Sequence, residues 1–238
     1  MFLFLTDYIN TISNQDLNEL LNGDPSMDGD QVRLKQEVWA QNRISSYIRQ
    51  RYNVALVFAP WLPWSLSASY TIGQYFQYTE NAFSTTSIYG LNARVSYNNA
   101  IYSCTTPVTT AGPFNSTNWT YVCDDLQIFT CIAASTNNYP DNTAYFSQSD
   151  PRDADVIKIM LHIVIYELNN LIVPAQIPEQ RWINYNNKGN PRKGDGSAIG
   201  TLLGWQEGTL MAYLPIYQDE DMGQSVSWGS NLKRNNSY

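Results

Sequence analysis

Apolar and polar residues follow a helical period in two segments of the chain, 31–52 and 153–172. In the first segment, positions three and four residues apart form one stripe, which predicts a helix that packs on a single face. The second segment is apolar almost all round and begins at Asp153, a residue type that caps helices. It is therefore predicted to be a helix buried on most sides by other helices or by neighbouring subunits. The stripe of the first segment consists of Leu34, Val38, Ser45, Ile48 and Tyr52.

The few polar residues of the second helical segment lie on one stripe. Lys158, His162 and Asn169 recur at helical spacing, and His162 is the only histidine of the chain. This setting favours a packed or rim position for His162 over a catalytic role. A further helix is expected from Pro178, because proline prefers the start of a helix.

Between the helical segments, the pattern changes to short strand-like runs separated by Asn-, Pro- and Gly-rich turns. Residues 61–150 contain one basic residue, Arg94, against five acidic ones, and Ser, Thr and Asn supply 33 of these 90 residues. They also hold 17 of the 32 aromatic residues, and burial of aromatic rings can stabilise a module this small. The sequence thus predicts an inserted β-rich module, 63–149, within a helical domain made of 1–62 and 150–238.

An imperfect internal repeat supports the β-rich module. The runs IYSC at 101–104 and IFTC at 128–131 are each followed by a small polar loop and then by aromatic residues and a proline. Two related strand–loop units are therefore expected. The predicted fold class is α+β: a small helical bundle interrupted by a small aromatic-rich β-domain, with an extended C-terminal tail. The residues that follow the runs are Pro113, Phe114, Asn115 and Trp119 in the first unit, and Tyr139, Pro140, Asp141 and Tyr145 in the second.

Charge and motifs argue against several classes of function. A net charge of −7 and a pI near 4.6 disfavour nonspecific binding to nucleic acid. The three cysteines lack the CxxC spacing of a zinc site, and nucleophile, P-loop, Rossmann and HExxH motifs are missing. We therefore expect no enzyme activity, no catalytic residues, no cofactor and no metal. No run is long enough to be a transmembrane helix, and the start MFLFLTD lacks the basic region of a signal peptide, so the chain is expected to fold in the cytoplasm.

The C-terminal segment, SVSWGSNLKRNNSY, is predicted to make contacts with another protein. Trp228, followed by Gly229 and Ser230, has the character of an aromatic anchor, and Lys233 and Arg234 form a basic tip. Polar groups of this kind need hydrogen-bonding partners when they are buried. A neighbouring subunit or a larger assembly could supply those partners.

The helical part resembles the head–tail connector proteins of tailed bacteriophages, also called adaptor or head-completion proteins. The resemblance is carried by LTDYINTISNQDLNELLNGD, by SSYIRQRYNV, by PRDADVIKIMLHIVIYELNN and by the ending WGSNLKRNNSY, and it covers about 150 residues. It implies a helical bundle, a ring of about twelve subunits beneath the portal protein, and no enzymatic activity. The implied location is the neck of the virion, assembled in the host bacterial cytoplasm, with tail or collar proteins docked below.

The inserted part resembles small carbohydrate-binding modules of the chitin- and cellulose-binding type. VSYNNAIYSCTT and PFNSTNWTYV carry this resemblance, over about 30 residues. It implies that Tyr97, Tyr102 and Trp119 could form a flat aromatic platform for a sugar or for another virion protein. The alternative interpretation is that these aromatic residues form the core of the module.

Two functional hypotheses follow. The first is a structural virion protein, an adaptor-ring subunit that binds the portal. DNA would pass through the ring without specific binding, in agreement with the acidic charge of the chain. No membrane partner is expected. The second is a glycan-binding or surface-attachment protein that uses the aromatic β-module.

Overall fold

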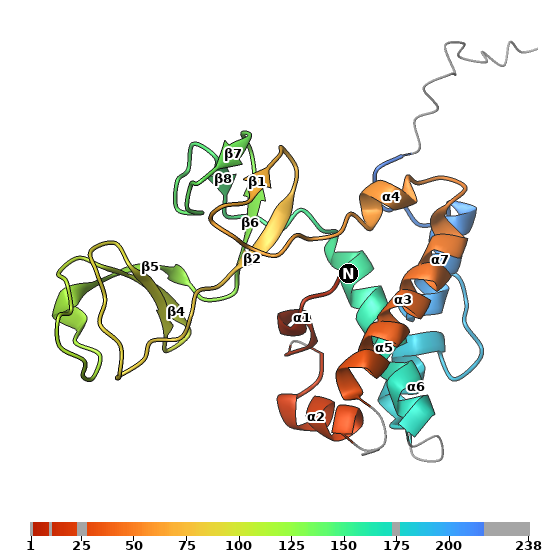
Figure 1. The fold of residues 1–238 in the computed structure, drawn as a ribbon. Coiled ribbons are helices and arrows are strands. Elements are labelled where there is room, and N and C mark those ends of the chain that lie inside the picture. The colour runs from red at the N-terminus through yellow and green to blue at the C-terminus, as the bar shows by residue number, and fades with distance from the viewer. Residues whose placement is uncertain (1, 10, 23–27, 173–176, 217–238) are drawn as a thin grey trace, which may run out of the picture.

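The computed structural model describes residues 2–9, 11–22, 28–172 and 177–216, and shows a mixed α+β protein. Figure 1 shows the helices gathered on one side and the strands in two groups that extend away from them. The group with β4 and β5 lies farthest from the helices, and the group with β2 and β6 lies between. In the described residues, the helices are α1 (Leu5–Ile9), α2 (Asn14–Asn22), α3 (Gly29–Ile48), α4 (Val54–Val57), α5 (Ala154–Ile172), α6 (Glu179–Asn186) and α7 (Ala198–Glu207).

The helices form one body around α5, which packs against α1, α2, α3, α6 and α7. The helix α5 begins as predicted, because the Asp153 carboxylate accepts hydrogen bonds from the backbone N–H groups of Asp155 and Val156. Its apolar side chains are buried on several sides, and Ile163 and Val164 are fully buried. The helix α6 begins directly after Pro178, also as predicted. The body thus has a single core that joins residues 2–58 to residues 156–214.

The predicted packing stripe of α3 is wrong in part: Ile48 and Tyr52 are buried in the core, as expected, but the stripe fails at Val38. Val38 is 60% exposed, whereas Arg33 and Glu37 are buried. These two side chains form an ion pair, and the Tyr8 hydroxyl on α1 donates a 2.9 Å hydrogen bond to Glu37. A buried charge is tolerated when it is paired and hydrogen-bonded, so α1 decides which face of α3 turns inward. The buried face of α3 consists of Arg33, Glu37, Ala40, Ile44 and Ile48.

The strands form three small antiparallel sheets among the described residues: β1–β7, β2–β6–β8 and β3–β4–β5. The first two sheets make up what we call the inner module (residues 64–78 and 127–147), and the third is in the outer module (residues 83–124). The strand bounds are β1 Ser69–Tyr70, β2 Tyr75–Tyr78, β3 Arg94–Tyr97, β4 Ala100–Cys104, β5 Trp119–Asp124, β6 Gln127–Cys131, β7 Ser135–Thr136 and β8 Phe146–Ser147, and the short 3-10 helix η1 spans Ser116–Asn118.

The two modules have the same internal design. In the outer module, the Tyr89 hydroxyl accepts a hydrogen bond from the Ser84 backbone N–H, and Cys104 pairs with Trp119 across two strands. In the inner module, Tyr70 and Ser65 make the same bond, and Cys131 pairs with Phe146. Each cysteine thiol also donates to the backbone carbonyl two residues ahead, at 3.1 Å. The predicted repeat is therefore part of a larger duplication that also includes residues 65–78 and 84–97.

The outer module is nested within the inner one. In the outer module, β3 and β4 are joined by a two-residue turn at Asn98 and Asn99, both with positive φ, the conformation that tight hairpins require. In the inner module, β2 pairs with β6 through Tyr78 and Gln127, and the whole outer module takes the place of that turn. The chain therefore passes from the inner module to the outer one and back, in two closely spaced crossings.

The three cysteines are free and buried. Burial raises the pKa of the Cys123 thiol to about 11, so this thiol stays protonated at neutral pH. Cys104 and Cys131 occupy equivalent core positions of the two modules. Their role in the described fold is packing.

Candidate functional site

The junction between the helical body and the inner module is organised by Arg152. Its side chain is 1% exposed and binds two carboxylates, Asp7 at 2.7 Å and Asp150 at 2.7 Å. It also donates to the Phe2 carbonyl at 2.8 Å, and its guanidinium lies over the Phe4 ring at 4.3 Å from the centroid. Burial alone would lower the pKa of Arg152, but the hydrogen bonds to Asp150 and Asp7 outweigh it and hold this pKa above its usual value.

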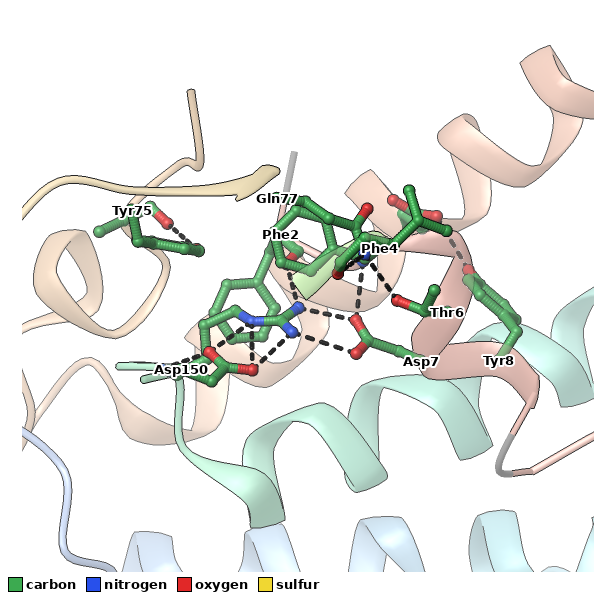
Figure 2. Close-up of polar contacts among 12 residues, drawn as sticks. Phe2, Phe4, Thr6, Asp7, Tyr8, Tyr75, Gln77 and Asp150 are labelled. Carbon is green, nitrogen blue, oxygen red and sulfur yellow. Dashed lines mark hydrogen bonds and ion pairs between the residues drawn. The ribbon is translucent and has the colours of Figure 1, made fainter. Parts of the chain in front are cut away.

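The first residues of the chain lie between the body and the inner module, as Figure 2 shows. The Gln77 amide on β2 donates a 3.0 Å hydrogen bond to the Thr6 hydroxyl on α1. The Phe4 ring contacts the Tyr75 ring edge-on at 6.3 Å between centroids, and the Tyr75 hydroxyl donates to the Ala59 carbonyl at 2.7 Å. Because these contacts come from Phe4, from α1 and from the segment after α4, they fix the direction in which the inner module leaves the body.

One face of the outer sheet carries an open group of aromatic side chains, which we call the outer aromatic face: Tyr97, Tyr102, Phe114 and Tyr121. Tyr97 and Phe114 are stacked with ring centroids 4.1 Å apart, and Tyr102 meets Phe114 at 5.1 Å. Tyr121 is 53% exposed, and its hydroxyl donates to the Asp124 carboxylate, which raises the pKa of Tyr121. This face combines flat apolar rings with hydroxyl and carboxylate groups at its edge.

The three aromatic residues proposed from the sequence do not have the same environment. Tyr97 and Tyr102 are half-buried members of the outer aromatic face, but Trp119 is 6% exposed. Trp119 packs against Phe114 from the inner side, with Val95 and Cys104 in the same core, so it cannot present a ring to a ligand. The prediction that Trp119 is part of an aromatic platform is therefore incorrect. The alternative interpretation, that it is a core residue of the module, applies to Trp119. Sequence reasoning missed Phe114 and Tyr121 as site residues, although both lie in the PFNSTNWTYV motif.

The equivalent face of the inner module is covered. Tyr78 and Phe129 occupy the positions of Tyr97 and Tyr102, and both are buried. The back of the outer sheet covers them, with Ile101 and Cys123 in the shared core. Around this contact, Arg94 forms two hydrogen bonds with Asp141 and lies 3.7 Å from the centroid of the Tyr139 ring. The same surface is therefore a protein contact in one module and exposed in the other.

The helical body has an exposed apolar patch, which we call the 211–216 patch: Leu56, Met211, Tyr213 and Ile216. Met211 is 89% exposed, Tyr213 97% and Ile216 69%. Two adjoining grooves that share Tyr213 and Leu214 run along it, and the larger has a volume of about 750 Å³. Within the described part of the chain, the backbone of residues 211–214 makes no hydrogen bond. A segment of this kind leaves both apolar and backbone groups open to a partner.

The contact residues proposed for the C-terminal segment, Trp228, Gly229, Ser230, Lys233 and Arg234, lie outside the described residues. Within the described ranges, no group of three or more His, Cys, Asp or Glu side chains could hold a metal ion. No helix in those ranges is long and apolar enough to cross a membrane.

Comparisons of this chain with protein-family models, with curated proteins and with solved structures find no match. The functional argument therefore rests on the residues and the geometry.

Proposed function

We propose that this chain is a structural protein of a tailed-phage virion, a subunit of an adaptor ring beneath the portal. The observation that carries this proposal is the 211–216 patch. Soluble monomers rarely leave a contiguous apolar groove with side chains as exposed as Met211 and Tyr213, so a neighbouring copy or the portal is expected to cover it. The resemblance of the helical part to connector proteins supports the same function.

Other features agree with this role. The net charge of −7 suits a channel wall that DNA passes without binding. The junction at Arg152 would hold the two β-modules in a fixed direction, as a docking surface for tail or collar proteins would require. Trp228, Lys233 and Arg234 remain the proposed contacts of the tail with the portal.

The test compares one double variant with one single control variant, both made in the full chain. Met211→Ser combined with Tyr213→Ser should fold normally, because both side chains lie in solvent, but should fail to co-sediment with the portal protein of the same phage. Ile72→Ser is the matched control, since Ile72 is 72% exposed on the inner module, away from the patch. Normal portal binding by the double variant would refute the role of the patch.

The tail is tested separately. Deletion of 226–238 is expected to leave the folded body intact and to block attachment to the portal. Particles assembled with the truncated protein should then be filled heads without tails in electron micrographs. Normal tailed particles would contradict the assigned contacts of Trp228, Lys233 and Arg234.

A second candidate function is glycan binding, favoured by the open outer aromatic face. Flat rings edged by hydroxyl and carboxylate groups suit a sugar ring, which has apolar faces and polar edges. Affinity electrophoresis against soluble chitin and cellulose derivatives tests it: retardation of the wild-type chain should disappear in Tyr97→Ala and Tyr121→Ala and remain in Tyr213→Ser. An unretarded wild-type chain would argue against this function.

A further inference from the structure

A groove runs along the polar side of α5, on the helical body. Two adjoining cavities, of about 240 and 530 Å³, share the side chains of Thr11, His162 and Asn184. Lys158 lines one cavity and Arg181 lines the other. We call this the α5 groove. It brings together residues from three separate parts of the chain: the segment between α1 and α2, the helix α5, and the helix α6.

The charges of the α5 groove are not balanced. Neither Lys158 nor Arg181 forms an ion pair with a carboxylate in the described residues. Asp7 lines one end, but its carboxylate is already bound to Arg152. Asp16 on α2 acts on Arg181 only as a nearby charge. Two cations therefore line adjoining cavities that meet at His162, in a protein whose net charge is −7.

His162 lines both cavities, and its pKa depends on the two cations. Burial lowers the pKa of His162, and the charges of Lys158 and Arg181 lower it further. Protonation of His162 is therefore opposed by burial and by the two cations, and an anion in the groove would favour it. The neighbouring Asn184 amide and Thr11 hydroxyl can add hydrogen bonds to an oxygen ligand.

We propose that the α5 groove is a binding site for a dianionic phosphate group, either free phosphate or the terminal phosphate of a small molecule. Two fixed cations match the charge of a phosphate dianion, and the guanidinium of Arg181 presents paired donors to its oxygens. The acidic charge of the whole protein repels an extended polyanion, so the site is suited to a small ligand rather than to a DNA strand. This site is independent of the adaptor role.

The test uses His162 as a reporter, since it is the only histidine in the chain. The imidazole NMR signals of the full-length protein are followed during titration with inorganic phosphate at pH 6 and pH 8. We expect the signals to shift saturably and the pKa of His162 to rise on binding. Because inorganic phosphate is mostly a monoanion at pH 6, the pH dependence of affinity is measured with sulfate, which should bind more tightly at pH 6 than at pH 8. Sulfate, a dianion throughout this range, should produce a similar shift.

Variants distinguish a specific phosphate site from a general effect of positive charge on phosphate binding. Arg181→Met and Lys158→Met should each weaken phosphate binding roughly tenfold or more, the usual effect of losing a hydrogen bond to a charged group. Arg181→Lys should restore part of the affinity, which shows that the fold is intact. Lys193→Met is the control, because Lys193 is an exposed cation paired with Glu207. Imidazole signals that do not respond to phosphate, or an equal effect of Lys193→Met, would overturn the proposal. Tighter binding of duplex DNA than of phosphate, per phosphate group, would also overturn it.

Discussion

Replacement of Arg152 by methionine should destabilise the protein by about 3–4 kcal/mol. Methionine fills much of the same volume but leaves Asp7 and Asp150 without their cation. Breaking a buried ion pair by removing one partner costs about 3–5 kcal/mol. The side chains of Asp7 and Asp150 are 13% and 32% exposed, so water compensates them in part, and the lower half of that range applies. Loss of the contact between the guanidinium and the Phe4 ring adds to this cost.

The assay is urea denaturation followed by circular dichroism at 222 nm, which reports the helical body. A second substitution, Asp7→Asn, should recover part of the loss in the Arg152→Met background, because it removes one of the two uncompensated carboxylates. Arg49→Met is the control: Arg49 is exposed and forms no ion pair with the described residues, so its substitution should change stability by no more than about 0.5 kcal/mol. A loss below about 1 kcal/mol for Arg152→Met, or no recovery in the double variant, would refute the importance of this junction.

Three further predictions concern the core, the inserted segment and the effect of pH. Ile163→Ala should cost about 2–4 kcal/mol in the same assay, because Ile163 is fully buried in the body; a loss below about 0.5 kcal/mol would contradict this. Replacing residues 63–149 by a short Gly/Ser linker should preserve the helical circular-dichroism signal, since the body core contains no residue of that segment; loss of the signal would refute it. Because the pKa of His162 is lowered in the folded state, the unfolded chain takes up the proton first, so stability should fall as pH decreases through 6.5. His162→Gln should reduce this pH dependence in urea titrations between pH 7.5 and 5.5, and an unchanged slope would argue against the lowered pKa.

Local signals in the sequence determined several elements directly. The capped start at Asp153, the continuous apolar pattern of α5 and the start of α6 after Pro178 all depend on interactions within a few residues, so one segment is enough to predict them. The strand runs 101–104 and 128–131 were recognised for the same reason, and so was the mixed α+β fold class.

Tertiary structure decided the features that depend on distant partners. Arg33 and Glu37 turn inward on α3, where Tyr8, far away in the sequence, donates a hydrogen bond to Glu37. The periodicity of α3 alone does not indicate that partner. The pairing of β2 with β6 spans the entire outer module, so the nested arrangement cannot be recognised from either strand alone.

The candidate sites illustrate the same division. The aromatic motif of the outer module was visible in the sequence. Trp119 and Tyr121 pair with Cys104 and Tyr102 on the same face of the sheet, so the residues that cover this face, and not the strand register, bury Trp119 and leave Tyr121 exposed. The α5 groove needs Lys158 and Arg181 from two helices, and only their packing places these cations along adjoining cavities. Local chemistry thus determined the elements and the residue types, and long-range burial determined which of those residues meet and which remain open to a partner.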